Sequence, residues 1–366
     1  MTKRILISAS AILISLSASA QNAPKYSNEF LSIGVGARGL GMGGAQAASV
    51  NDITSGYWNP AGLTLGVGDL QLGLMHAEYF AGIGKYDYAA LAAPIDATRT
   101  VGFSMIRFAV DDIPNTLFLI EPDGSPNYNN ITSFSSADYA VLLSYSQILK
   151  QKDDLFISFG GNAKIIHRSV GSFAKAWGFS LDAGIQIKKN KWMFGVTLRD
   201  VTTTFNAWSF TFTDREKEVL YLTNNDIPTK STELTAPRLI GAVAKNFVFN
   251  SKFSLLAEAN LHFTFDGKRN TVISTNPISI DPNLGIEANL NNSVFLRAGI
   301  SNFQRALADG DTTNQKKVWI FQPSFGAGFK FGNVGIDYGF TNLANQSNPL
   351  YTHIFSLRID LVKKEK

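Results

Sequence analysis

Apolar and polar residues alternate over stretches of about ten residues through most of the chain beyond residue 68. Between Phe253 and Asp266 every odd-numbered residue up to Phe265 is apolar, whereas most even-numbered residues are polar. The stretches 155–168 and 177–188 repeat the pattern. A period of two residues is typical of a β-strand with one apolar face, and helical periodicity is nearly absent. The chain is therefore expected to be all-β.

The alternating stretches predict fourteen strands. They lie near residues 69–80, 86–93, 99–110, 135–147, 154–168, 174–188, 191–199, 236–247, 253–265, 278–288, 293–302, 318–331, 334–342 and 351–361.

From the second strand onward, short connections alternate with connections that include long polar loops. The short ones are 94–98, 148–153, 189–190, 248–252, 289–292 and 332–333, and the long ones are 111–134, 200–235, 266–277, 303–317 and 341–350. Short turns at one end and long loops at the other are typical of antiparallel barrels in outer membranes. An even strand number brings the first and last strands to the same side, and closing the ring removes the edges that lipid cannot satisfy.

A β-sandwich or a secreted propeller would also alternate, but the chain shows neither a linker nor a repeat period. Its apolar faces also carry aromatic residues near strand ends, as the interfacial girdles of a membrane barrel require. These aromatics are Trp177, Trp192, Trp319, Phe331 and Phe355, and Phe321, Phe325 and Phe329 share a face with Trp319. The last strand is followed by a short charged tail, 362–366, whereas many such barrels end on an aromatic residue.

The amino terminus has the features of an export signal. Lys3 and Arg4 precede an apolar run, 5–16, that ends in small residues up to Ala20. The run is too short to span roughly 30 Å of hydrocarbon as a helix, so residues 1–20 are expected to be a cleaved signal peptide.

The chain of 366 residues contains no cysteine, which excludes disulfides. Removing the signal leaves 31 basic and 29 acidic side chains, so no nucleic-acid-binding surface is indicated.

Residues 21–68 precede the first strand and lack its alternation. A barrel of fourteen strands is wider than side chains alone can fill, since about eight strands already suffice for a packed interior. This segment is therefore predicted to fold into the bore as a plug, followed by a barrel over 69–366. Its glycines permit close approach to the wall, Trp58 is a candidate buried anchor, and Arg38 is expected to pair with a carboxylate in the lumen.

The stretch FLSIGVGARGLGMGGAQAASVNDITSGYWNPAGL, Phe30 to Leu63, resembles the amino-terminal signature of the PorV/PorQ family. These proteins are FadL-like outer-membrane barrels of the type IX secretion system in Bacteroidetes. The resemblance implies a fourteen-stranded barrel plugged by its amino-terminal segment. The plug residues that carry it are Gly36, Ala37, Arg38, Gly41, Met42, Gly43, Gly44, Trp58, Asn59, Pro60, Ala61 and Gly62.

The resemblance implies a role without catalysis, in which the barrel binds the type IX translocon barrel or the carboxy-terminal signal domain of exported cargo. Loops on a rigid scaffold are the natural surface for such partners. The expected partner-binding residues lie in the loop 200–235 and are Phe205, Trp208, Phe210, Phe212, Tyr221 and Leu222. Alternatively, these aromatics extend the neighbouring strands and pack together.

The NPAG element also occurs in FadL-type transporters, which leaves open a channel for hydrophobic small molecules. Leu40, Met42 and Trp58 would then line a pocket rather than a dry contact. An outer-membrane enzyme is a third possibility, disfavoured because no catalytic constellation is visible.

Other motifs do not predict a cofactor or a metal. Residues 34–39 spell G-x-G-x-x-G, but no βαβ pattern follows, as dinucleotide binding would require. The loops 122–124 and 309–311 are more typical of turns than of calcium sites. The four histidines, which lie on separate strands and lack metal-ligand spacing, are His76, His167, His262 and His353.

Overall fold

The computed structural model describes residues 27–66, 68–121, 123–228, 230–307, 316–341 and 351–361. The predicted signal peptide, 1–20, and the charged tail, 362–366, lie outside the described residues. None of the helices in these described parts is long and apolar enough to cross a membrane.

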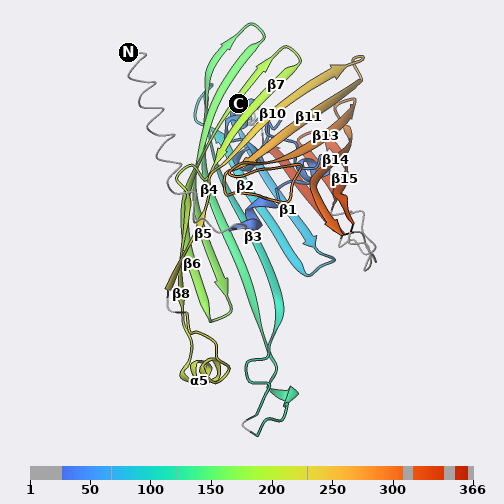
Figure 1. Ribbon diagram of the computed structural model, residues 1–366. Helices are drawn as coiled ribbons and strands as arrows, with labels where there is room; N and C mark the ends of the chain where they lie inside the picture. Colours follow the sequence, from blue (N-terminus) through green and yellow to red (C-terminus); the bar gives the residue numbers. More distant parts are fainter. Residues whose placement is uncertain are drawn as a thin grey trace.

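Fourteen antiparallel strands of the described chain form a closed barrel, which confirms the predicted fold class (Figure 1). Strand β1 closes the ring by pairing with β17 from Leu70 opposite Leu361 to Glu78 opposite His353. The strands, in order around the ring, are β1 (Leu70–Tyr79), β2 (Gly84–Pro94), β3 (Arg99–Asn115), β4 (Thr132–Lys152), β5 (Leu155–Val170), β6 (Ala174–Lys189), β7 (Trp192–Arg199), β10 (Arg238–Val248), β11 (Phe253–Thr264), β13 (Ser279–Leu290), β14 (Val294–Leu307), β15 (Lys317–Phe331), β16 (Val334–Thr341) and β17 (Thr352–Leu361).

The two faces of the wall differ as the alternation predicts. On β6, Phe179 and Ile185 are exposed on the outer face, whereas Ser180 and Gln186 are buried on the inner face. The outer faces of the other strands carry exposed Leu, Ile, Val and Phe side chains in the same way. Water would disfavour so much apolar surface by about 25 cal/mol per Å², so the outer wall is suited to apolar surroundings.

A row of polar and aromatic residues crosses the outer face towards the long-loop end. Pairing between neighbouring strands places Tyr338, Phe355, His76, Asp87, Arg107, Tyr139, His167 and Trp177 in register. Trp192 on β7 and Phe331 on β15 are exposed at the other end of the barrel, beside the short connections. Aromatic residues therefore border the apolar band at both ends, as the sequence predicts for an interfacial girdle.

The predicted loop 200–235 contains ordered secondary structure. It contains β8 (Thr204–Phe210), α5 (Asp214–Leu222) and β9 (Lys230–Thr235). Strand β6 pairs with β7 along Ala183–Lys189 and with β8 along Ala174–Phe179. Because β7 is shorter than β6, β8 supplies hydrogen bonds that the rest of β6 would otherwise lack. Two further elements lie in the other long connections, η4 (Tyr128–Asn130) and β12 (Ile273–Ser274).

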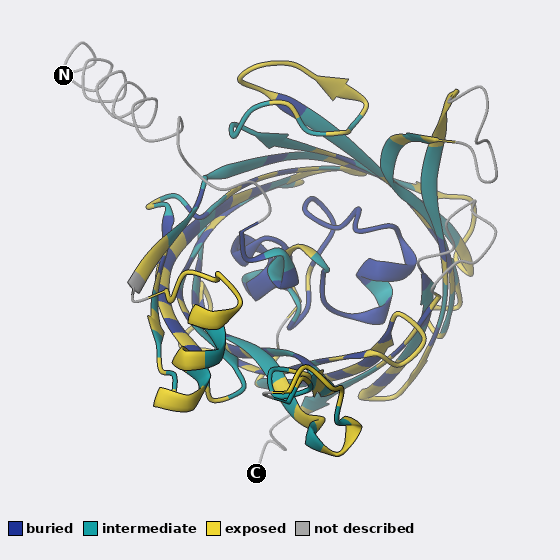
Figure 2. Ribbon diagram, turned by 60° about the horizontal axis from the view of Figure 1, so that its bottom comes forward, coloured by how far each residue is buried: buried dark blue, intermediate teal, exposed yellow. Residues whose placement is uncertain are grey.

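The segment before β1 lies inside the ring of strands, where it forms a buried core (Figure 2). Its short elements are η2 (Glu29–Ser32), α2 (Ala37–Gly41), α3 (Ser55–Trp58), η3 (Pro60–Gly62) and α4 (Leu63–Gly66). We call residues 27–66 the inner segment. That it seals the bore against solutes stays a prediction.

Polar side chains on the inner wall hydrogen-bond to the backbone of the inner segment. The amide nitrogen of Asn162 donates to the Gly56 carbonyl at 2.7 Å, and that of Gln186 donates to the Val50 carbonyl at 3.0 Å. Asn260 and Asn283 donate to the carbonyls of Gly44 and Gly43. These contacts explain why inward positions are polar: an irregular backbone inside the barrel needs partners for its carbonyl groups.

Wall glycines allow the inner segment to approach the strands closely. A Cβ atom added at Gly299 would lie 2.1 Å from the carbonyl carbon of Met42, and one at Gly195 would lie 2.2 Å from the Ala47 oxygen. A Cβ at Gly160 would lie 2.3 Å from the carbonyl carbon of Pro60. Close approach therefore depends on glycines of the strands as well as on the glycines of the inner segment expected from the sequence.

Candidate functional site

Arg38 joins the inner segment to the wall through a chain of ion pairs. Its Nε donates to Oε2 of Glu287 on β13 at 2.8 Å, so it has the carboxylate partner expected from the sequence. Arg297 on β14 donates to the same oxygen at 2.6 Å and to Asp337 on β16 at 2.6 Å. Two guanidinium groups thus share one buried carboxylate, which ties α2 to three strands.

Asp52 forms a second ionic attachment. Its Oδ2 accepts from Arg358 on β17 at 3.1 Å, and its Oδ1 accepts from the Thr54 backbone nitrogen at 2.9 Å. Burial by itself would raise the pKa of Asp52, but Arg358, Arg38 and the Thr54 donors together hold it below the ordinary value. Asp52 is therefore ionised at neutral pH and keeps its attachment.

The predicted anchor Trp58 is 4% exposed, and its Nε1 donates to the Val35 carbonyl at 2.9 Å. Its ring fills space beside Gly34, Gly39 and Gly44. The remaining plug residues all contact the wall or the inner segment itself. Three of them donate hydrogen bonds to the wall: the backbone nitrogens of Gly36 and Ala37 to the Met75 sulfur and the Ser356 hydroxyl, and the Asn59 side chain to the Ile185 carbonyl. The others lie in close contact, Gly41 against Gly326, Met42 against Gly285, Gly43 against Ile300, Pro60 and Ala61 against Gly160, and Gly62 against Val50.

The six predicted partner-binding residues separate into two groups. Trp208, Phe210 and Phe212 are partly buried: Arg168 lies 5.2 Å from the Trp208 ring, and Phe210 and Phe212 stack on aromatic neighbours. Phe205 is exposed on the outer wall, where it pairs with Phe179 and extends the apolar band. Tyr221 and Leu222, at the end of α5, are 77% and 72% exposed. The structure therefore does not bring the six residues together as one surface.

A cavity of about 650 Å³ lies between the inner segment and the strands β1, β7, β10, β11, β13, β14, β15 and β16. We call it the vestibule. One part of its lining is apolar and consists of Ile33, Leu40, Tyr57, Trp58, Tyr79, Phe80 and Ile240. Of the three residues named for a pocket beside the plug, Leu40 and Trp58 belong to this lining, whereas Met42 lies outside it.

The charged part of the vestibule contains three arginines together with the carboxyl groups of Glu29 and Asp281. The Arg199 guanidinium stacks over the Tyr57 ring at 4.3 Å and donates to the Tyr57 carbonyl at 3.0 Å. Arg238 donates to Ser32 at 2.6 Å, and Arg269 donates to Asp266. These residues lie at strand ends or in a connection far apart in the chain, so the sequence analysis did not single them out. The one feature of the sequence that could have pointed to them is an arginine at an inward position near the long-loop end.

Several buried polar atoms in the vestibule lining have no hydrogen-bond partner within the described residues. They include His262 Nε2, Thr264 Oγ1, Asp281 Oδ1 and Thr341 Oγ1. Buried polar groups are normally paired with protein, water or ligand. The vestibule therefore offers an apolar surface beside groups that can pair with the polar part of a small molecule.

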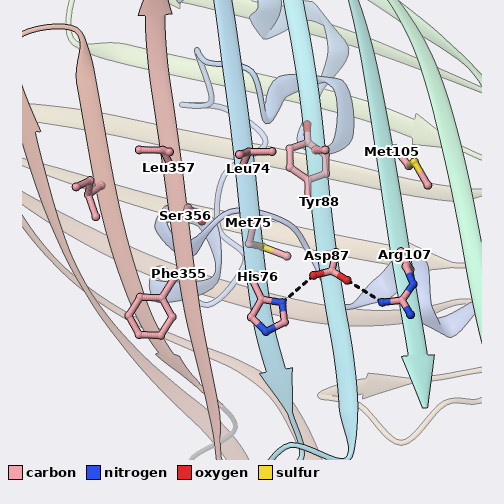
Figure 3. Close-up of a pocket in the computed structure, with 12 residues that line it drawn as sticks. Leu74, Met75, His76, Asp87, Tyr88, Met105, Arg107, Phe355, Ser356 and Leu357 are labelled. Carbon is pink, nitrogen blue, oxygen red and sulfur yellow. Dashed lines mark hydrogen bonds and ion pairs between the residues drawn. The ribbon is translucent and has the colours of Figure 1, made fainter. Parts of the chain in front are cut away.

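A second hollow of about 570 Å³ lies on the outer wall across β16, β17, β1, β2 and β3. In Figure 3, Asp87 lies between His76 and Arg107 and accepts a hydrogen bond from the guanidinium of Arg107 at 3.0 Å. His76 Nδ1 lies 2.7 Å from the other Asp87 oxygen. These groups belong to the polar row of the outer face and do not line the vestibule. Among the described residues, no group of three or more His, Cys, Asp or Glu side chains is arranged to hold a metal ion.

Comparison with known proteins identifies the fold. No family model matches the sequence, and no curated protein does either. The CymD monoaromatic hydrocarbon channel superposes with a TM-score of 0.54 at 14% identity, covering 91% of this chain and 99% of its own. The Ralstonia pickettii toluene transporter TbuX gives a TM-score of 0.52 at 13% identity, covering 90% of this chain and 99% of its own. A Pseudomonas aeruginosa FadL homologue gives a TM-score of 0.50 at 13% identity, covering 89% of this chain and 98% of its own. At these identities the likeness shows a shared FadL-like barrel fold.

Proposed function

We propose that this protein is an outer-membrane barrel that admits small molecules with a hydrophobic body and a polar group. The observation that carries the proposal is the vestibule, where Tyr57, Trp58 and Ile240 lie beside Arg199 and Arg238. Pockets for small molecules are mostly apolar and contain a few placed polar groups. The apolar outer face supports the membrane location.

The solved structures of this fold support the same proposal. They include a monoaromatic hydrocarbon channel and a toluene transporter. This chain differs from a purely apolar conduit because arginines line its vestibule. We expect a molecule with a carboxylate or another acceptor group to be favoured over a neutral hydrocarbon, since guanidinium groups pair well with such acceptors.

We propose that passage beyond the vestibule requires movement of the inner segment. Its backbone is hydrogen-bonded to Asn162, Gln186 and Asn260, and its charges are paired with Glu287 and Arg358. A ligand displaces such a segment only by binding the moved state more tightly than the resting state. Entry into the vestibule and release past the inner segment are therefore separate steps.

Uptake measurements test the proposal. Cells that express the barrel would be given radiolabelled dodecanoate or radiolabelled toluene, and accumulation would be compared with that of cells carrying an empty vector. Ser301 lines the vestibule, so Ser301→Trp should block uptake by occupying the cavity. Ser251 is exposed in the β10–β11 turn, so Ser251→Trp serves as the matched control and should leave uptake unchanged. Equal accumulation with and without the barrel, for both probes, would reject the transport proposal.

A type IX secretion adaptor is the second candidate, in which the barrel binds the translocon barrel or cargo signal domains. It is favoured by the motif from Phe30 to Leu63 and by exposed apolar residues on the long-loop end. Tyr221 and Leu222 on α5 are exposed, as are Ile120 and Tyr128 on the β3–β4 connection. Arg215 of α5 lies 4.4 Å from the Phe118 ring, which brings these two projections together.

Isolation in mild detergent from the native membrane tests this second candidate. Identification of a large translocon barrel or of cargo carboxy-terminal domains in the purified complex would support it. Recovery of the barrel with neither, together with uptake that depends on the vestibule, would leave transport as the function.

A further inference from the structure

Of three neighbouring hairpins at the short-connection end, two carry positive charge and none carries negative charge. The β6–β7, β10–β11 and β13–β14 hairpins cover residues 186–194, 245–255 and 288–295 at their turns. These ranges contain five lysines and no aspartate or glutamate. The lysines are Lys188, Lys189, Lys191, Lys245 and Lys252. This part of the rim therefore attracts anions.

A groove of about 600 Å³ lies on the outer wall beneath these hairpins, across β10, β11, β13 and β14. The pairing register aligns Lys245 with Ala257, then with Ile286 and Ala298. The outward residues Ala257 on β11 and Ala298 on β14 are small and lie between larger side chains such as Val243 and Ile286. The groove is apolar along its length and has a lysine at its upper border.

Lys245 is held at that border by aromatic rings. Its Nζ lies 4.6 Å from the Trp192 ring centroid and 4.9 Å from the Phe247 ring centroid. A cation over aromatic faces is attracted to them, and the contact restricts the long side chain. Lys191 adjoins this position, since its carbonyl accepts from the Asn246 backbone nitrogen at 2.9 Å. Lys245 therefore borders the end of the apolar groove, and Lys191 lies beside it in the β6–β7 turn.

We infer that this groove binds an anionic glycerophospholipid, with an acyl chain along the groove and the phosphate beside Lys245 and Lys191. The inference rests on the membrane location in the proposed function, and is independent of what the barrel transports. Lysine binds phosphate as a point charge, and a basic cluster near a membrane surface attracts anionic lipids. The interfacial position of Trp192 places the charged groups at headgroup level.

Charge and position favour a phospholipid over other occupants. A second copy of the chain would bring its own five lysines against these five, with no carboxylate on either set of turns to pair with them. The long-loop end, where the β8, α5 and β9 elements lie, is at the opposite end of the barrel (Figure 1). The groove therefore faces the leaflet at the short-connection end, and the phospholipid belongs to that leaflet.

Native mass spectrometry of the intact, detergent-purified barrel tests the inference. The protein would be incubated with phosphatidylglycerol or with phosphatidylcholine of identical acyl chains, and retained lipid would be counted. We expect phosphatidylglycerol to be retained in preference, and Lys245→Gln to lower its apparent affinity about fivefold, the effect expected for one lysine near an anionic surface. Lys330→Gln is the matched control, because Lys330 is exposed at the same end but on β15, away from the groove.

A groove-filling variant, Ala298→Leu, should lower retention of both lipids, because it occupies the acyl chain's place. Equal retention of the two lipids by the unmodified protein would overturn the inference without any variant. An equal effect of Lys245→Gln and Lys330→Gln would also overturn it, by showing attraction to the whole rim. Because lipid retention is measured without transport, failure here would leave the uptake proposal untouched.

Discussion

Arg38 and Glu287 lie 249 residues apart in the chain, yet the Nε of one is 2.8 Å from the Oε2 of the other. The pair connects the inner segment to the wall, and both side chains are largely buried. Arg297 donates to the same carboxylate, so Glu287 keeps one partner if Arg38 is lost.

Arg38→Met should detach α2 from β13. Removing one partner of a buried ion pair typically costs about 3–5 kcal/mol, and the retained Arg297 should bring the loss towards the lower end. Urea unfolding followed by tryptophan fluorescence would measure it. The double variant Arg38→Met, Glu287→Gln should lose less than the two single variants summed, whereas strict additivity would argue against coupling.

Gly299→Ala should displace the inner segment from the wall. The added Cβ would lie 2.1 Å from the carbonyl carbon of Met42, far inside the ~3.5–4.0 Å at which carbon atoms attract. The chain has no cysteine, so Ser49→Cys provides a single reporter at a buried position of the inner segment. Maleimide labelling of that reporter should be faster in the Gly299→Ala background.

Gly241→Ala is the matched control for this substitution. A Cβ at Gly241 has its nearest neighbour, an atom of the Phe263 ring, at 3.9 Å, so it fits without displacement. Labelling that accelerates equally in both backgrounds would show that the wall glycines have no special role in seating the inner segment.

Acid should weaken the attachment made by Asp52. Because its folded pKa lies below the ordinary value of 3.8, the stabilisation is complete above that value and is lost as pH falls through the lower folded pKa. Asp52→Asn should therefore be less stable than the unmodified protein at pH 7, and the difference should shrink towards pH 3. A difference independent of pH would mean that the Asp52 charge does not stabilise the fold.

Tyr221→Ser with Leu222→Ser tests the partner-binding hypothesis at α5. Both side chains are largely exposed, so the stability of the barrel should change by no more than about 0.5 kcal/mol. If the long-loop end binds a secretion partner, recovery of that partner should fall. Phe205→Ser is the contrasting variant, because Phe205 lies on the outer wall and its loss should affect membrane insertion instead.

Alternation along the chain located the strands well, because lipid on one side and a polar interior on the other act on every second residue. The predicted strand 253–265 is observed as Phe253–Thr264, and 174–188 as Ala174–Lys189. Alternation did not locate β8 and β9 within the loop 200–235, because both are short, β8 pairs with β6 across an intervening strand, and β9 pairs with β8. β6 extends beyond β7, and β8 is needed because it supplies the hydrogen-bond partners that this extension would otherwise lack.

The sequence by itself determined a closed barrel preceded by a glycine-rich segment, since periodicity and connection lengths are local properties of the chain. It also identified Arg38 as a residue in need of a carboxylate. Only the tertiary structure decided that Glu287 supplies it, and that Arg199, Arg238 and Arg269 converge on one vestibule. Such meetings depend on how the ring closes and staggers its strands, which brings distant residues together without leaving a local pattern.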